Sequence, residues 1–532
     1  MKNKNFVLII LFIFTFLGCA KRGSITGGEK DITPPKIVSC YPKNLSTDFK
    51  ENSVRITFDE YIKIKDLDKN LVVSPLMKNQ ITVTPQGGVS KQMVIKWRDT
   101  LKANTTYSFN FGESIIDNNE GNAFKNLKYV FSTGKTLDSL KLNGSITDAI
   151  DKKIHTGINV MLYEVDSKYN DSIVFKETPR YLANVSDSTA TFTIENIQEG
   201  KYRLLALKET SKNYKYDAKR DKIAFHSEII TIPTTNQYTL KLFKEKNKFS
   251  TKKPQQASGN RILLPYEGNG KNIKLSALYK GSEFPIRYSK IMDKDSLQIW
   301  TKPIKNDSLI LNIKNDDYSK SYTVNFRDFK KDTLHLSSKT TTLGLKENFK
   351  IKTATPLEKW DLAKFSLTKK GGAKVAFKPL YDAFNQNFEL VFDKEENEKY
   401  DLKIMPQAIE DYLGQKNKDT LTYQFSTKSL ADYGNLKLSL KNVKSFPLIV
   451  ELTDNKGKVM YQQFVTKVPE VSFDLIEPQK YNIRVIYDTN NNQEWDSGSF
   501  IENRQPEAVY HFPTEIDVRA NWDVNQDIDL GK

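Results

Sequence analysis

Almost every part of the 532-residue chain alternates between a short run rich in Tyr, Phe, Val, Ile or Thr and a turn rich in Gly, Asn or Asp. Residues of the first kind favour strands, and residues of the second kind favour turns. No long stretch has a helical period, and the one short helix we predict is PQAIEDYLG at 406–414. A chain of this length is too long for one core. The sequence therefore predicts an all-β protein of several domains.

One strand and the loop after it occur twice in the chain. KYRLLALKETSKNYKYD (201–217) and KYNIRVIYDTNNNQEWD (480–496) align without a gap at an offset of 279, and five of the seventeen positions are identical. Two further segments, 106–121 and 129–146, have weaker echoes at 399–414 and 423–440 in the same order. These echoes predict that a pair of domains is duplicated.

The N-terminus predicts export. Lys2 and Lys4 precede an apolar run from Phe6 to Leu17, which is shorter than the roughly twenty residues needed to span a bilayer, and Gly18-Cys19 follow. This pattern resembles a lipoprotein signal, although Phe16 and Leu17 replace the usual Leu and small residue. The resemblance implies a signal peptide at 1–18, acylation of Cys19 and a flexible tether at 19–33. Cys40 then has no partner for an intrachain disulfide, and it fits a buried position in a strand.

Residues 34–134 contain about seven strand-like runs, a number that suits a β-sandwich. Through TPPKIVSCYP, VRITFDEYI and YVFSTG, they resemble the bacterial Ig-like domains of S-layer proteins. Residues 138–245, with LNGSITDAIDKKIHTGINVMLY and ATFTIENIQEGKYRLLALKET, resemble the carboxypeptidase-regulatory, transthyretin-like domain. We expect a linker at 246–258, a middle β-domain at 259–341, a second, diverged Ig-like domain at 346–428 and a second transthyretin-like sandwich at 435–532. The fold class expected is tandem β-sandwiches in an extended array, with contacts mainly between neighbours.

The whole chain also resembles Ig-like lipoproteins of Bacteroidota-type bacteria, through CAKRGSITGGEKDITPP and YHFPTEIDVRANWDVNQDIDL. That resemblance implies a non-enzymatic protein held in the outer-membrane lipid by Cys19. It also implies an interaction scaffold with integral outer-membrane protein partners, such as assembly or transport machinery. The basic Lys21 and Arg22 favour the periplasmic face, but cell-surface exposure stays open. The alternative is a surface glycan-binding lipoprotein, suggested by the net positive charge and five Trp residues.

Other function classes find little support. The net charge of +16 comes from scattered Lys residues, which suits anionic surfaces, and we find no nucleic-acid reader motif. The four His residues are isolated in sequence, and we find no HExxH, GxSxG, phosphate-loop or CxxC motif. We therefore expect no catalytic residues, no small-molecule substrate and no cofactor other than Ca²⁺ in one loop.

That loop follows the second copy of the repeated strand. Asp488, Asn490, Asn492 and Asp496 occupy positions 1, 3, 5 and 9, as in calcium loops of the helix-loop-helix kind. Position 6 is Gln493 instead of Gly, and position 12 is Ser499 instead of an acid. The first copy has Lys215 at position 7, which would oppose a cation. The alternative is a hairpin tip built from turn-forming residues.

Eight triplets of Asp, then Ser or Thr, then an apolar residue or Thr occur along the chain. They resemble the O-glycosylation sequon of Bacteroidota, and they also fit plain turn-to-strand boundaries. The hydroxyl residues are Thr100, Ser139, Ser172, Ser188, Ser296, Ser308, Thr333 and Thr420.

Overall fold

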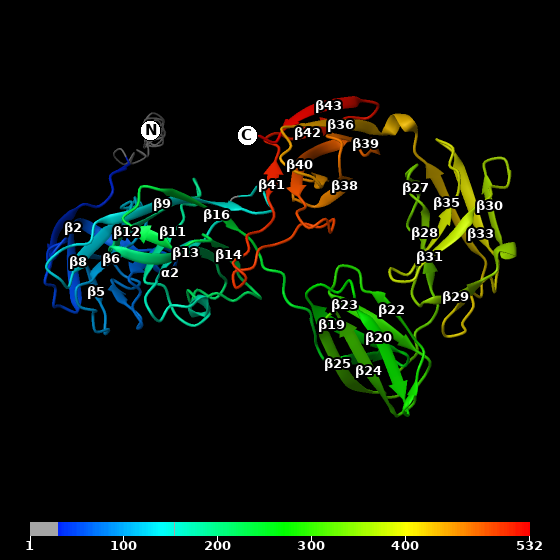
Figure 1. The fold of residues 1–532 in the computed structure, drawn as a ribbon, viewed down its shortest axis with the longest axis horizontal. Coiled ribbons are helices and arrows are strands. Elements are labelled where there is room, and N and C mark those ends of the chain that lie inside the picture. The colour runs from blue at the N-terminus through cyan, green and yellow to red at the C-terminus, as the bar shows by residue number, and fades with distance from the viewer. Residues whose placement is uncertain (1–29, 154, 532) are drawn as a thin grey trace, which may run out of the picture.

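A computed structural model describes residues 30–153 and 155–531. The signal peptide, Cys19 and most of the tether lie outside the described residues. The described chain forms five β-sandwiches (Figure 1), which confirms the predicted all-β class of tandem β-sandwiches. Among the described residues, helical structure is limited to α2 (Leu67–Asn70) and the short 3₁₀ helices η1 (Asp171–Phe175), η2 (Leu362–Lys364) and η3 (Leu430–Asp432). The helix expected at 406–414 is wrong, because Ile409 is buried and begins strand β34 (Ile409–Asp411), which pairs with β29 (Leu357–Trp360).

The first sandwich (37–132) has a sheet of order β1-β2-β5-β4, with β7 paired to β2, and a sheet of order β3-β6-β8. In the core between them, Trp97 stacks on Phe131 and lies tilted against Phe109. Cys40 packs against this core as a half-buried free thiol, and burial raises its pKa. The strands are β1 (Ile37–Tyr41), β2 (Ser53–Ile64), β3 (Val72–Ser74), β4 (Thr82–Thr84), β5 (Ser90–Lys96), β6 (Thr106–Asn110), β7 (Ile115–Asp117) and β8 (Lys128–Ser132).

The second sandwich (140–242) has a sheet of order β11-β10-β13-β14, with β15 paired to β13, and a sheet of order β12-β9-β16 in which β16 runs parallel to β9. Gly144 on β9 is needed there, because a Cβ atom would lie 2.2 Å from the carbonyl oxygen of Tyr238. The strands are β9 (Leu140–Asp148), β10 (Asn159–Glu164), β11 (Tyr181–Asn184), β12 (Thr191–Ile197), β13 (Gly200–Lys208), β14 (Lys222–Phe225), β15 (Ile230–Ile232) and β16 (Gln237–Leu242).

The third sandwich (250–325) has sheets of order β17-β19-β23-β22, with β18 paired to β19, and β21-β20-β24-β25. Trp300 is fully buried, beneath the guanidinium of Arg261. The strands are β17 (Ser250–Thr251), β18 (Gln255–Ser258), β19 (Arg261–Glu267), β20 (Lys274–Tyr279), β21 (Ser282–Glu283), β22 (Ile286–Lys290), β23 (Ser296–Thr301), β24 (Ser308–Asn315) and β25 (Tyr318–Asn325).

The fourth sandwich (336–427) repeats the strand order of the first, with sheets β26-β28-β32-β31 and β27-β35-β33-β30 and the separate pair β29-β34. The long bent β2 of the first sandwich corresponds to two strands here, β28 and β29. The remaining strands are β26 (Leu336–Ser337), β27 (Thr342–Leu343), β28 (Phe349–Thr353), β30 (Phe365–Lys369), β31 (Lys378–Asp382), β32 (Asn387–Val391), β33 (Lys399–Ile404) and β35 (Leu421–Thr427).

The fifth sandwich (434–529) repeats the order of the second, with sheets β39-β36-β43 and β38-β37-β40-β41, and β42 paired to β40. Its last strand, β43, again runs parallel to its first, β36. The strands are β36 (Gly434–Lys441), β37 (Leu448–Thr453), β38 (Val459–Val465), β39 (Glu470–Ile476), β40 (Gln479–Tyr487), β41 (Val509–His511), β42 (Ile516–Val518) and β43 (Asp523–Asp529).

Neighbouring sandwiches contact one another directly. The Leu182 amide donates to Ser74 Oγ at 3.3 Å between the first and second. Tyr412 Oη donates to the Pro285 carbonyl at 2.7 Å between the third and fourth. Lys428 pairs with Glu477 at 2.6 Å between the fourth and fifth. Lys219 pairs with Glu267 at 3.6 Å between the second and third. Each step of the array therefore has a direct contact.

The fifth sandwich also packs against the second, so the last four sandwiches surround an open centre (Figure 1). This arrangement corrects the expectation of contacts mainly between neighbours. The physical reason is a longer connection in the fifth sandwich: 488–508 joins β40 to β41, whereas 209–221 joins the matching β13 and β14.

Candidate functional site at the junction of the second and fifth sandwiches

The loop with calcium-like spacing forms a tight turn after β40. The buried Asp488 carboxylate accepts hydrogen bonds from the Asn492 amide at 3.1 Å and the Gln493 amide at 2.8 Å. The side-chain oxygens of Asn490 and Asn492 each accept the amide two residues further on. Asx turns of this kind hold a loop in shape with or without a metal.

The first copy of the loop has the same backbone. Glu209 accepts the amides of Asn213 and Tyr214, the counterparts of Asn492 and Gln493 at the offset of 279. Lys212, Tyr214, Asn491 and Gln493 all have positive φ. Position 6 is therefore left-handed in both copies although neither has the Gly that this conformation favours. The repeat is one of backbone geometry, and it does not require a metal in both copies.

Position 9 of the downstream loop already faces a cation. Asp496 pairs with Lys246 at 2.8 Å and accepts the side-chain amides of Asn490 at 2.5 Å and Asn492 at 2.8 Å. Partial burial works against ionisation, but Lys246 and the two amides lower the pKa of Asp496. A calcium ion at this position would have to displace Lys246. These contacts favour the turn interpretation, and calcium binding by the loop stays a prediction.

The residue that closes this loop comes from further along the chain. The buried Glu507 accepts the Thr489 amide at 2.6 Å and the Asp496 amide at 3.0 Å. It thereby bridges the two ends of the loop.

Beyond Asp496, the chain packs against the second sandwich. Phe500 is fully buried in an apolar cluster that consists mainly of side chains of the second sandwich. Its ring meets Phe225 edge-on, with centroids 5.2 Å apart, and also contacts Phe175 and Tyr216. Phe500 is absent from the core of its own sandwich. Its burial therefore stabilises the contact between the two sandwiches.

Arg203 is the charged partner of this aromatic contact. Its guanidinium lies 5.3 Å from the Phe225 ring and 5.3 Å from the Phe500 ring, and the residue is 2% exposed. Its nitrogens donate to the carbonyls of His226 and Ser227 and, at 2.9 Å, to Asn503 Oδ1 of the fifth sandwich. A buried arginine needs such partners, because an unpaired charge there would be costly.

Hydrogen bonds clamp this inserted segment, 497–505, on both sides. Ser497 donates to the Lys244 carbonyl, and the Phe500 amide donates to Glu245. On the other side, Gln505 donates to the Phe225 carbonyl at 2.9 Å. Gly498 is required for the close approach, since a Cβ atom would lie 2.5 Å from the Phe243 ring.

A second contact lies at the turn between β9 and β10. Arg484 on β40 donates to the Ile150 carbonyl at 2.9 Å, and Lys152 donates to the Phe512 and Pro513 carbonyls. We call these two contacts together the 2–5 junction: the segment 494–505 against the second sandwich, and the turn 148–153 against the fifth.

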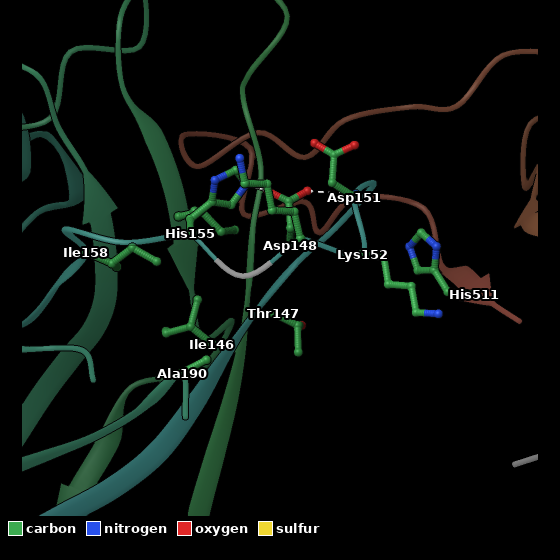
Figure 2. A pocket seen from close by; sticks show the side chains of 11 residues that line it. Ile146, Thr147, Asp148, Asp151, Lys152, His155, Ile158, Ala190 and His511 are labelled. Atoms are coloured by element: carbon green, nitrogen blue, oxygen red, sulfur yellow. Dashed lines mark hydrogen bonds and ion pairs between the residues drawn. The ribbon is translucent and has the colours of Figure 1, made fainter. Parts of the chain in front are cut away.

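A cavity of about 220 Å³ lies beside the second contact. In Figure 2, Asp148, Asp151 and His155 lie together, while His511 lies on the far side of Lys152. The buried Asp148 accepts the amides of Ile150 and Asp151 and pairs with Lys222 at 2.7 Å. His155 Nε2 lies 2.7 Å from Asp148 Oδ2, and its Nδ1 lies 3.1 Å from Lys208 Nζ.

Asp148, Asp151 and His155 could in principle hold a metal, because their ligand atoms lie within 4.8 Å of one another. Lys222 and Lys208 contact the same groups, however, and would repel a divalent cation. Burial, Lys222 and Lys208 lower the pKa of His155, although Asp148 opposes them. We interpret the group as an ion-pair network that fixes the turn.

The eight triplets lie at the surface or near it. Thr100, Ser139, Ser188, Thr333 and Thr420 are exposed, whereas Ser172, Ser296 and Ser308 are half-buried. Ser172 is engaged in the cap of η1 through Asn170. Glycosylation at these positions stays a prediction.

Sequence reasoning missed Phe500, Arg203 and the cavity residues. One usable signal was present: the β40–β41 connection is longer than its counterpart and contains the aromatic Phe500 within GSFIENRQ.

The comparisons with known proteins identify one domain. Residues 31–133 match the family model described as Bacterial Ig-like domain. The search of curated proteins found no match. The chain therefore contains a bacterial Ig-like domain within a series of tandem Ig-like β-sandwiches.

Solved structures resemble the chain only weakly. The S-layer protein rSbsC(31-844) is 10% identical, with 91% of this chain and 67% of that one covered and a TM-score of 0.15. Bacteroides ovatus SGBP-B from a mixed-linkage glucan utilization locus, in complex with a heptasaccharide, is also 10% identical, covering 68% and 87%, with a TM-score of 0.17. Sidekick-1 immunoglobulin domains 1-4 are 9% identical, covering 72% and 94%, with a TM-score of 0.17. TM-scores this low do not support an argument about the fold of this chain. The five-sandwich architecture is established by the strands and sheets described above.

Proposed function

We propose that this chain is a non-enzymatic, lipid-anchored protein of the outer membrane that acts as an interaction scaffold for integral outer-membrane proteins of assembly or transport machinery. The observation that supports the proposal is a frame of sandwiches that contact one another directly. Five sandwiches contact their neighbours, and the fifth closes back on the second. Such a frame can hold partners at defined spacings. The anchor rests on Cys19, and among the described residues no helix is long and apolar enough to cross a bilayer.

The test is co-purification from a detergent-solubilised envelope. The full chain with a C-terminal tag should recover integral barrel proteins in a fixed ratio. The matched control is Cys19→Ser, which keeps the frame but loses the anchor, and it should recover the partners in reduced amount. If neither chain recovers a reproducible partner, the scaffold proposal is wrong.

A surface glycan-binding role is the second candidate. Trp97 and Trp300 are buried, and Trp360 and Trp495 are half-buried. The tryptophan that remains available for stacking on a sugar is Trp522, which is 54% exposed beside Arg519. A cleft of about 1190 Å³ between the first and second sandwiches has many amide and charged side chains, among them Asn159 and Asn184. A glycan array should then give a signal that Trp522→Ala or Asn184→Ala removes. A silent array would exclude this role.

The face of the membrane decides which partners the frame can reach. Protease treatment of whole cells should leave the protein intact if it faces the periplasm and should digest it if it lies on the cell surface.

A further inference from the structure

The 2–5 junction has an apolar half and a charged half. The apolar half is Phe500 and the rings around it. The charged half lies between the turn 148–153 and the β40–β41 sheet, where Arg484 and Lys152 cross from one sandwich to the other. His511, on β41, lies in this charged half and lines the cavity.

His511 has an unusual position for a histidine. Its Nε2 atom is buried and has no hydrogen-bond partner. Arg484, which pairs with the buried Glu451 of β37 at 2.6 Å, faces it from its own sheet, and the second sandwich contributes Lys152, Asp151 and Asp148. Lys153 and His155 line the same cavity. When the two sandwiches separate, the groups of the second sandwich leave, and the imidazole meets water.

A proton on His511 would therefore add charge at a buried nitrogen that has no hydrogen-bond acceptor, beside Arg484 and Lys152. Burial is the largest cause that lowers the pKa of His511, and the charges of Arg484 and Lys152 lower it further. The carboxylates of Asp151 and Asp148 act in the opposite direction and raise this pKa. A histidine whose pKa is lower in the closed state favours that state above its ordinary pKa of about 6.5. That stabilisation decreases as the pH falls below this value, and it is fully lost below the pKa of the closed state.

We propose that the 2–5 junction is a latch, which keeps the last four sandwiches closed on one another at neutral pH and releases the fifth sandwich from the second when His511 takes up a proton. The released chain is the extended array. Release exposes Phe500 and the aromatic surface that receives it, so an apolar contact site becomes accessible in mildly acidic surroundings.

His155 is not the trigger. Its partners Asp148, Lys208 and Lys222 all belong to the second sandwich. Those contacts remain when the fifth sandwich leaves, so protonation of His155 does not distinguish the closed state from the open one.

The test is small-angle X-ray scattering on the soluble Cys19→Ser chain without its signal peptide, at pH 7.5 and pH 5.5. Two variants define the open state, Phe500→Asp and Gly498→Val, and both change the inserted segment rather than the core of the fifth sandwich. A third variant, His511→Gln, cannot be protonated. Hydrogen exchange at the amides of 498–505 measures the separation of the fifth sandwich from the second at the inserted segment itself.

We expect the unchanged chain to have a smaller radius of gyration than both open variants at pH 7.5. At pH 5.5 its radius should shift toward theirs, and its 498–505 amides should lose protection. His511→Gln should show neither change. A wild-type radius equal to that of both open variants at pH 7.5 would overturn the latch. An absent acid response, or one that persists in His511→Gln, would overturn the role of His511.

Discussion

Arg203 shows how one charged side chain can support an interface between sandwiches distant in sequence. It is buried between the rings of Phe225 and Phe500, and the fifth sandwich supplies one of its hydrogen-bond acceptors, Asn503. Removing either aromatic partner therefore leaves the guanidinium with less packing as well as creating a void.

Phe500→Ala should weaken the 2–5 junction by about 3 kcal/mol, in the range found when a buried Phe is truncated. The chain should then open without unfolding, since Phe500 lies outside the core of its own sandwich. Hydrogen exchange at 498–505 and the radius of gyration should report it. The neighbouring Ile501, which is 60% exposed, provides the matched control, and Ile501→Ala should change neither.

Asp148→Asn should destabilise the second sandwich by about 2 kcal/mol at pH 7, because Lys222 loses its buried partner but stays partly hydrated. Burial raises the pKa of Asp148, but the bond from Lys222 and the amides of Ile150 and Asp151 lower it more. The stabilisation is present above the ordinary carboxyl pKa and is lost as the pH falls through the lower pKa of the folded state. The free energies of unfolding of wild type and variant, measured with denaturant, should become equal in strong acid. Asp151→Asn is the control, and it should lower the free energy of unfolding less, because Asp151 lies further from Lys222.

Cys19→Ser should release the protein from the membrane fraction. The prediction rests on the lipoprotein-like signal, because acyl chains stabilise membrane binding by about 0.8 kcal/mol per buried CH₂. Fractionation with a high-salt wash measures it. Continued sedimentation of the variant would show that a protein partner holds the chain as firmly as lipid does.

At the scale of elements, the repeated strand and loop form the clearest feature. β13 and β40 coincide position by position at the offset seen in the sequence, and the same carboxylate position caps the turn after each. What differs is the remainder of the connection, which stays within the second sandwich in one copy and reaches another sandwich in the other.

Calcium should not change the melting temperature of the soluble chain, because Lys246 already neutralises Asp496. Scanning calorimetry in calcium and in chelator tests this. A bound ion at a hundred times its dissociation constant would add about 2.7 kcal/mol and raise the melting temperature by a few degrees. If such a rise is seen, Asp488→Ala with Asp496→Ala should remove it, whereas Glu209→Ala in the upstream loop should not.

The strands were predictable because residue type and turn chemistry are local properties. The left-handed backbone at Gln493 was not, since its sequence signal, glycine, is absent and the cap from Asp488 supplies the conformation instead. The strand at 409–411 was hidden by a short helix-like pattern, because its partner β29 lies about fifty residues away. Arg203 and Asn503 lie three hundred residues apart, and nothing local marks such a pair.

At the scale of the whole molecule, the duplicated order of sandwiches has a geometric result. The second and fifth sandwiches share a strand order, and so do the first and fourth. The first lies outside the closed part and leads toward the tether, while the fourth lies within it (Figure 1). Copies of one architecture thus occupy different surroundings.

The closed junction also decides how mechanical load passes through the molecule. A pull between the tether and the C-terminal strand β43 crosses from the second sandwich directly to the fifth through segment 494–505 and the turn 148–153. The third and fourth sandwiches then bear little tension. They add to the end-to-end length of the molecule only after the junction opens. Once the junction breaks, the chain lengthens in a single step, and these two sandwiches begin to bear the force.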